Sequence, residues 1–99
     1  MILYNVTVKV DQSAEKDWLD YMRKHVPDVI GTGCFTGYRM CRLLEQPEGD
    51  DPTYTIQYEC ESKAILNVYL EKYAPALREE VNQLFKDRFV AFRTVMEVL

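Results

Sequence analysis

Hydrophobic and polar side chains alternate along three stretches of the chain, which is the pattern of a strand with one buried face. These stretches are residues 2–10, 34–44 and 53–61, and the last of them alternates most cleanly. Residues 89–99 are rich in β-branched and aromatic side chains, which favour a fourth strand. In the first and third strands the apolar face consists of Tyr4, Val6, Val8 and Val10, and of Tyr54, Ile56, Tyr58 and Cys60.

Between the first two strands, apolar residues recur at the spacing of a helix. They are Ala14, Trp18, Met22 and Val26. This stripe predicts an amphipathic helix that packs on the sheet, with Asp11 or Ser13 as its N-cap. Because the residue before a proline avoids the helical conformation, Pro27 predicts that the helix ends at about His25 or Val26.

A second helical region follows the third strand. Ser62 is a natural N-cap for it. Ala74-Pro75 interrupts this helix, and a further helical piece begins at Pro75, a favoured first-turn residue. The inward stripe of that piece consists of Leu77, Val81, Leu84 and Phe85, and its outward residues are Arg78, Glu79, Glu80 and Lys86. Asp87-Arg88 then turns the chain into the last strand.

The predicted order is strand, helix, strand, strand, helix, strand. This is the split βαβ arrangement, an α+β domain in which a four-stranded antiparallel sheet has its helices on one face. We expect one such domain over residues 1–99, with the first and third strands in the centre. Their second faces carry Leu3, Asn5, Thr7 and Lys9, and Thr55, Gln57 and Glu59. This mixed face is either exposed to solvent or packed against the same sheet of a second copy, and we favour the homodimer.

Length, charge and loop composition exclude several function classes. A chain of 99 residues with a formal net charge of -4 suits one domain and disfavours binding to nucleic acid or to an anionic membrane, which depends on basic residues. Residues 45–52, EQPEGDDP, are typical of a solvated hairpin loop, and their oxygen spacing matches no calcium-binding loop. A single histidine without spaced thiols predicts no metal site.

The start of the sequence and the cysteines predict a cytoplasmic location. The first ten residues have no basic leader and alternate in polarity, so they resemble neither a signal peptide nor a spanning helix. Cys34, Cys41 and Cys60 form no C-x-x-C motif, which favours free thiols in a reducing compartment.

Five segments carry a resemblance to a known family. They are MILYNVTVKVD, WLDYMRKHVPDVIGTGCFTGYRMCRLL, TIQYECES, YAPALREE and FVAFRTVME. Across nearly its whole length the chain resembles a bacterial domain-of-unknown-function family, numbered four-two-eight-six, which looks like a member of the dimeric α/β-barrel superfamily. The resemblance implies a ferredoxin-like βαββαβ subunit that pairs into a dimeric α/β barrel. Relatives in that superfamily include cofactor-free quinone-forming monooxygenases, haem-degrading enzymes and isomerases.

His25 and Asn5 are the candidates for catalytic, proton-handling groups. A helix end beside Asp28 would favour the protonated form of His25, and the alternative is a helix cap or a surface histidine that bonds to Asp28. Strand interiors disfavour asparagine, and a buried amide needs partners, so Asn5 serves either a site or the dimer face. The family resemblance favours a site, because monooxygenases of the superfamily commonly use a polar side chain of the first strand. A haem-degrading relative would place a histidine ligand on the second helix, but residues 75–86 contain no histidine, so we expect no cofactor.

Arginines and tyrosines are the candidates for ligand binding. Arg39, Arg42 and Arg93 lie on or beside predicted strands, where a cation must reach water, a carboxylate or an anionic ligand. Alternation would put Arg39 and Arg93 on one face as a clamp for a carboxylate or phenolate, and edge charges that discourage aggregation are the alternative. Four tyrosines are expected at the gap between sheet and helices, either as pocket walls or as an aromatic core. They are Tyr4, Tyr54, Tyr58 and Tyr69.

Two function classes follow from the sequence. In the first, the protein binds a small aromatic or anionic molecule, or acts as a cofactor-free enzyme of the monooxygenase or isomerase kind. In the second, it is a non-catalytic dimeric module with a structural or regulatory role. A cavity of about 300 Å³ or more with convergent polar atoms would favour the first class, and a filled interior would favour the second.

Overall fold

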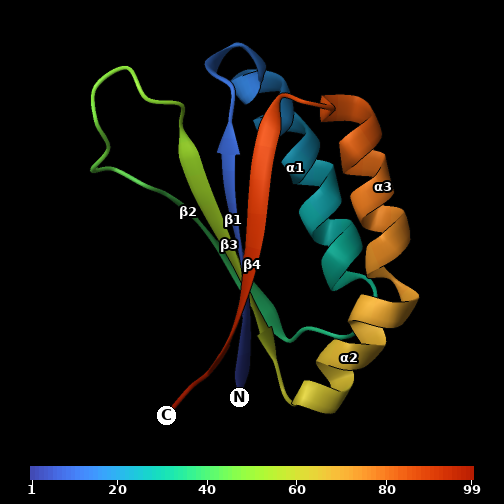
Figure 1. Cartoon of the computed structure of the whole chain (residues 1–99). Helices are drawn as coiled ribbons and strands as arrows, with labels where there is room; N and C mark the ends of the chain where they lie inside the picture. Colours follow the sequence, from blue (N-terminus) through green and yellow to red (C-terminus); the bar gives the residue numbers. More distant parts are fainter.

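The computed structural model describes residues 1–99 as a four-stranded antiparallel sheet with its helices on one face (Figure 1). The elements are β1 (Ile2–Val10), the 3₁₀ turn η1 (Gln12–Ala14), α1 (Glu15–Ile30), β2 (Gly37–Arg42), β3 (Thr53–Cys60), α2 (Lys63–Lys72), α3 (Ala74–Phe85) and β4 (Phe89–Glu97). The strand order β2-β3-β1-β4 confirms that the first and third strands are central. This is the ferredoxin-like fold that the sequence pattern predicted. None of the helices combines the length and the apolar character that crossing a membrane requires.

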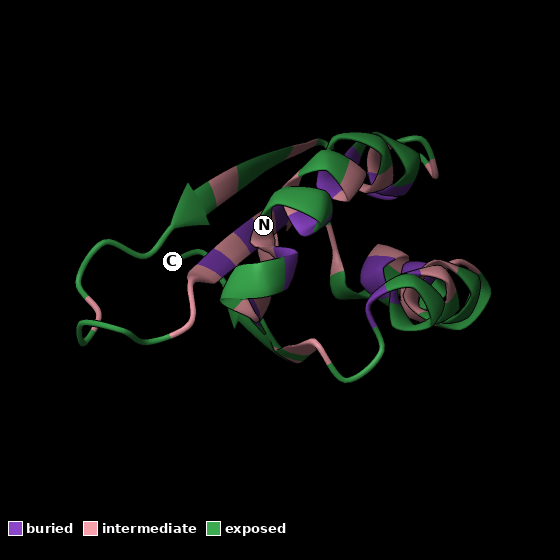
Figure 2. Cartoon of the chain, turned by 90° about the horizontal axis from the view of Figure 1, so that it is seen from above, coloured by how far each residue is buried: buried purple, intermediate pink, exposed green.

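Strand register gathers the apolar side chains of the sheet on the face that the helices cover. Tyr4 lies opposite Tyr58, and Val8 lies opposite both Tyr54 in β3 and Ala91 in β4. Burial alternates strictly along β3, as its sequence predicted. Figure 2 shows the buried segments of the helices on the sides that face the sheet. The opposite face of the sheet has no element of this chain above it, and we call it the open face.

The first helix differs from the prediction at both ends. It continues through Pro27 to Ile30, five residues beyond His25. A proline inside a helix costs one backbone hydrogen bond, but Val26 and Val29 are both buried against the sheet, so core packing offsets that cost. The expected N-cap is also wrong, because η1 precedes the helix and neither Asp11 nor Ser13 caps it through a side chain.

The other boundaries agree more closely with the sequence. The Ser62 side chain accepts a hydrogen bond from the Ile65 amide and caps α2, as expected. Strand β2 is shorter than residues 34–44, because Cys34 and Phe35 enter the core before the strand begins. Strands β3 and β4 end before residues 61 and 99. Asp87, with a positive φ of 62°, makes the turn between α3 and β4.

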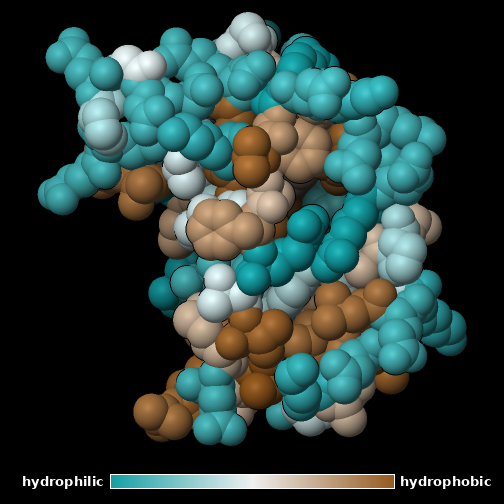
Figure 3. Space-filling view, viewed as in Figure 1, coloured by the Kyte–Doolittle hydropathy of each residue, from teal (hydrophilic) through white to brown (hydrophobic).

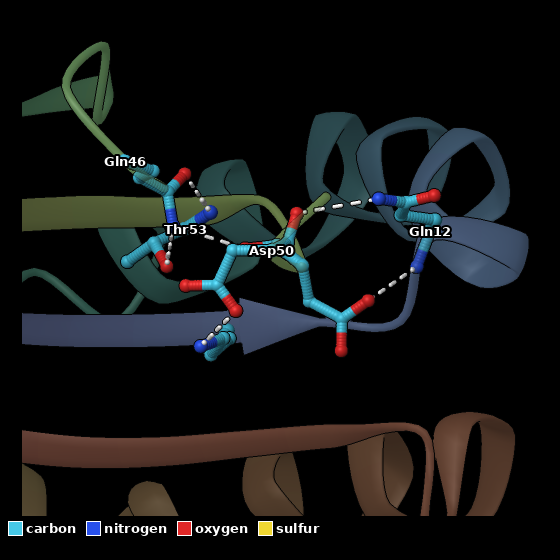
Figure 4. A network of polar contacts seen from close by, with 6 residues as sticks. Gln12, Gln46, Asp50 and Thr53 are labelled. Carbon is cyan, nitrogen blue, oxygen red and sulfur yellow. Dashed lines mark hydrogen bonds and ion pairs between the residues drawn. The ribbon is translucent and has the colours of Figure 1, made fainter. Parts of the chain in front are cut away.

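Polar contacts hold the loop between β2 and β3 against the end of β1 (Figure 4). Lys9 forms an ion pair with Asp50 at 2.8 Å. Gln12 donates its side-chain amide to the Asp50 carbonyl and its backbone amide to Asp51, while the Gln46 side chain bonds to Thr53. These contacts are exposed or half-buried and therefore fix the loop position more than they stabilise the fold.

Candidate functional site

A buried chamber of about 60 Å³ lies between the covered face of the sheet and the helices. The sheet contributes Tyr4, Val6, Val8, Ile56, Tyr58, Phe89, Ala91 and Arg93 to its walls, and the helices contribute Trp18, Met22, His25, Val29, Tyr69, Leu77, Arg78, Val81 and Asn82. This volume holds several water molecules but is well below the roughly 300 Å³ of a typical ligand pocket. The chamber alone therefore accommodates only part of a ligand.

A wider cleft of about 470 Å³ adjoins the chamber between α3 and β4. The residues that line both spaces are Arg78, Asn82, Phe89, Ala91 and Arg93, and the cleft alone adds Lys86, Asp87 and Val90. Figure 3 shows strongly hydrophilic side chains across the surface between β4 and α3, with hydrophobic side chains above and below them. Chamber and cleft together form one recess with an aromatic inner end and a polar mouth.

Three tyrosines, Tyr4, Tyr58 and Tyr69, line the chamber and pack around Phe35 behind them. Phe35 packs against Tyr58 and Tyr69 with ring centroids 5.0 Å and 4.7 Å apart, and Tyr4 stacks on Phe35 at 6.1 Å. Burial raises the pKa of Tyr69 to about 12 and raises that of Tyr58 further. These hydroxyls are therefore neutral at physiological pH and can donate hydrogen bonds.

Arg78 and Arg93 bring positive charge to the mouth from opposite sides. Arg78 lies on α3 and donates to the Tyr4 hydroxyl at 2.9 Å, so its predicted outward orientation is wrong. Arg93 lies on β4 opposite Val6, on the covered face. Both charges act on Tyr69, where they partly oppose the rise in its pKa that burial causes. Neither guanidinium has a carboxylate within ion-pair distance.

His25 lines the chamber from the middle of α1. Its Nδ1 atom is buried and has no hydrogen-bond partner. Burial lowers the pKa of His25, and the opposing charges of Glu80 and Asp28 do not overcome this. The expectation that a helix end keeps the ring protonated is therefore wrong, and so is a bond to Asp28, whose carboxylate binds Lys24 at 3.2 Å. A neutral imidazole that faces a cavity can accept a proton.

Trp18 also lines the chamber and has a second unpartnered nitrogen. Its side chain is fully buried, and its ring packs against Tyr54 at a centroid distance of 5.0 Å. The indole Nε1 has no hydrogen-bond partner. An indole N–H is a donor only, so Trp18 and His25 offer complementary groups from one face of α1.

Asn5 lies on the other side of the sheet. It alternates with Tyr4 and Val6, which line the chamber, and its side chain therefore belongs to the open face. The amide nitrogen donates to the Thr7 hydroxyl at 3.1 Å, whereas Oδ1 is buried without a partner. The structure does not bring Asn5 and His25 together.

Arg39 and Tyr54 also lie outside the chamber. Arg39 is exposed and sits opposite Gln57 on the open face, so it shares no face with Arg93. The Tyr54 hydroxyl donates to Glu15 at 2.5 Å and accepts from Arg42 at 3.2 Å. The predicted residues that do converge on the chamber are Tyr4, His25, Tyr58, Tyr69 and Arg93.

Sequence reasoning missed three polar residues of the recess. The sequence pattern predicts Trp18 only as part of the apolar stripe of its helix and predicts that Arg78 points outward. No sequence pattern marks Asn82. Their spacing in the sequence could have indicated two of them. Arg78 and Asn82 are four residues apart, and each follows an inward residue of α3. Such positions lie at the border of a helix's apolar face.

Comparisons with known proteins agree with this architecture. Residues 1–99 match the family described as "Domain of unknown function (DUF4286)", and no curated protein matches the chain. An antibiotic biosynthesis monooxygenase has a TM-score of 0.71 at 13% identity and covers 100% of this chain and 99% of its own. A dimeric ferredoxin-like protein from an uncultured marine organism has a TM-score of 0.69 at 16% identity, covering 98% and 97%. The heme-degrader MhuD from Mycobacterium tuberculosis, with two hemes in its active site, has a TM-score of 0.69 at 15% identity, covering 100% and 96%. These likenesses show the fold.

Proposed function

We propose that this chain, which belongs to the DUF4286 family as its sequence predicted, binds a small aromatic molecule. The molecule would lie in the chamber and the adjoining cleft. The observation that carries this proposal is that two residues of a largely apolar chamber, Trp18 and His25, each have a buried nitrogen without a hydrogen-bond partner. A buried polar atom without a partner is costly. A ligand that supplies a donor and an acceptor would remove this cost, and the surrounding rings offer it stacking surfaces.

The chemistry that we assign to the site is cofactor-free and of the monooxygenase or isomerase kind. His25 would accept a proton from an acidic C–H or phenolic O–H group of the ligand, because its neutral form prevails. The neutral hydroxyls of Tyr58 and Tyr69 would then donate to the oxygen that gains charge. The resulting enolate isomerises when a proton returns to a different carbon, or the phenolate is oxidised by O₂, one oxygen atom entering the ring as a quinone oxygen and the other leaving as water. Antibiotic biosynthesis monooxygenases are among the proteins of the same fold.

Haem does not fit the chamber that His25 lines, although a heme-degrader shares the fold. The chain has one histidine, on α1, and none on α2 or α3. The His25 side chain faces a chamber of about 60 Å³, which is far too small for a porphyrin ring. We therefore assign no step to haem.

We propose further that the chain forms a homodimer through the open face and acts in the cytoplasm. Strand β4 presents Val90 and Phe92 on that face, exposed by 70% and 62%. Side chains of this kind in register on a sheet favour a self-complementary partner. The buried Oδ1 of Asn5 would gain a donor there, which is the role that we assign to Asn5. A solved relative in fold is described as dimeric, and the three free cysteines are compatible with a reducing compartment.

The small chamber also favours a second candidate function. Its volume is about 60 Å³ and the rings of Tyr4, Phe35 and Tyr58 pack closely against one another. If this cluster is only a core, the protein is a non-catalytic dimeric module with a structural or regulatory role. Ligand binding distinguishes the two candidates.

The test uses Trp18, the only tryptophan, as a reporter that lies in the chamber wall. Titration with p-cresol should change the tryptophan fluorescence in a saturable manner. Replacing Ala91 by leucine would fill the chamber and abolish the change, whereas Ala76→Leu, on the exposed surface of α3, is the matched control and should bind normally. Oxygen uptake with hydroquinone then tests the monooxygenase chemistry. A flat titration up to millimolar probe would favour the non-catalytic module.

A further inference from the structure

We infer that the ligand of the recess is an aromatic carboxylate whose anionic group is bound by Arg78 and Arg93 at the mouth. This inference rests on the proposed function and adds a ligand class to it. The ring would occupy the junction of chamber and cleft, and the carboxylate would lie in the cleft between α3 and β4.

Arg78 and Arg93 converge on one space from two elements. Both line the chamber and the cleft. Both also lower the pKa of Tyr69 electrostatically, against the larger rise that burial causes, so both lie close enough to act on its hydroxyl. One guanidinium nitrogen of Arg78 donates to the Tyr4 hydroxyl. The other N–H groups of the guanidinium can donate to a ligand. Planar forks that face the same space are suited to a carboxylate, which accepts two parallel hydrogen bonds from such a group.

The cleft is positively charged in an acidic protein. The charged residues that line it are Arg78, Lys86, Arg93 and Asp87, so cations outnumber anions, whereas the whole chain has a net charge of -4. Carboxylates elsewhere on α3 are already engaged. Glu80 pairs with Lys24 of α1 at 2.8 Å, and Glu79 accepts from Gln83. A bound anion would therefore meet uncompensated positive charge, with the amide of Asn82 as a further donor.

The size of the two spaces limits the ligand. The chamber, at about 60 Å³, is smaller than the roughly 150 Å³ cavity that encloses a benzene ring. A single ring therefore enters only in part, and its remainder lies in the cleft of about 470 Å³ beside Phe89 and Ala91. A carboxylate attached to that ring points to the cleft, where the arginines are.

Benzoate and benzamide provide the matched probes, because they have nearly the same shape and differ in charge. Titration of wild-type protein, followed by Trp18 fluorescence and calorimetry, should give benzoate an affinity at least about tenfold higher than benzamide. Arg93→Gln and Arg78→Gln should each lower the benzoate affinity by about tenfold and leave benzamide binding nearly unchanged. Arg93→Lys should restore part of the loss. Arg23→Gln, which removes an exposed arginine on α1, is the control and should bind both probes normally.

The outcomes distinguish a failure of the carboxylate inference from a failure of the aromatic site. Equal affinities for benzoate and benzamide would overturn the carboxylate inference and leave the aromatic site intact. The same holds if benzoate binds more tightly but neither arginine substitution weakens it. If neither probe binds while p-cresol does, the carboxylate inference is overturned and the aromatic site remains, whereas failure of p-cresol as well would contradict the proposed function itself. Far-UV circular dichroism of each variant verifies that it is folded.

Discussion

The two faces of the sheet differ in how far this chain completes them. On the covered face, Trp18 is fully buried, and the hydroxyls of Tyr4 and Tyr54 are hydrogen-bonded. On the open face, Phe92 is 62% exposed while the Oδ1 atom of Asn5 is buried without a partner. The covered face thus has its helices as a partner within the chain, and the open face still lacks a surface of complementary chemistry.

This difference separates the two properties that a substitution can change. Residues of the covered face contribute to folding and, around the chamber, to ligand binding. Residues of the open face contribute little to the isolated subunit, and on our proposal they determine whether two subunits associate. Substitutions on the covered face are therefore expected to change stability, and substitutions on the open face of the same strands are expected to change assembly.

The largest effect is expected on the covered face, from Trp18→Ala. Removing a fully buried indole creates a cavity in the core and should lower the free energy of unfolding by about 3–5 kcal/mol. Urea denaturation followed by circular dichroism measures this value. Leu44→Ala is the control, because Leu44 is exposed, and it should change stability by less than about 0.5 kcal/mol. Similar losses in both variants would contradict the assigned core.

The next effect is expected on the open face, from Phe92→Glu. A charge on the exposed apolar part of the proposed interface should weaken dimerisation by at least about 2 kcal/mol, or roughly thirtyfold, while the unfolding of the subunit changes little. Sedimentation velocity over a range of concentrations measures the association. Val68→Glu makes the same change at an exposed position of α2 and should leave the dimer intact. If the Phe92→Glu variant still forms the dimer, the interface lies elsewhere. If the wild-type protein is a monomer, the proposed interface does not exist.

A smaller effect distinguishes the two kinds of tyrosine on the covered face. Tyr54→Phe removes the hydrogen bonds to Glu15 and Arg42 and should lower the free energy of unfolding by about 1 kcal/mol without changing p-cresol binding. Tyr4→Phe removes the bond from Arg78 beside the chamber and should alter probe affinity. If Tyr54→Phe weakened the probe more than Tyr4→Phe did, the placement of the site would be wrong.

The smallest effect concerns the pH dependence that His25 causes. Burial lowers its pKa in the folded protein, so the unfolded chain, with a pKa near 6.5, takes up the proton first. The stability contribution of the neutral ring is therefore complete above that value and is lost as the pH falls towards the folded-state pKa. Unfolding free energies at about pH 7.5 and 5.5 should differ more for the wild type than for His25→Gln. A steeper pH dependence in the variant would show that His25 is protonated in the folded protein.

The sequence by itself determined the fold. Alternation along β1 and β3, the helical stripe from Ala14 to Val26 and the Ser62 cap are local patterns, and each has one efficient way of burying its apolar side. Element order then left the split βαβ arrangement with β1 and β3 in the centre. The same patterns placed Tyr4 and Tyr58 on the covered face and Tyr69 on the buried side of α2, because strand and helix periodicity decide which side a residue faces.

The tertiary structure alone decided which polar residues meet. Local sequence predicts that the first helix ends near Pro27, but the burial of Val26 and Val29 stabilises α1 beyond that residue. His25 therefore lies within the helix and lines the chamber, and not at a helix end. Arg78 points inward because the Tyr4 hydroxyl is there to accept from it. The pKa of His25 falls because packing buries the ring and so disfavours its charged form. These are long-range effects, since they depend on groups distant along the chain, and so local pattern could not specify them.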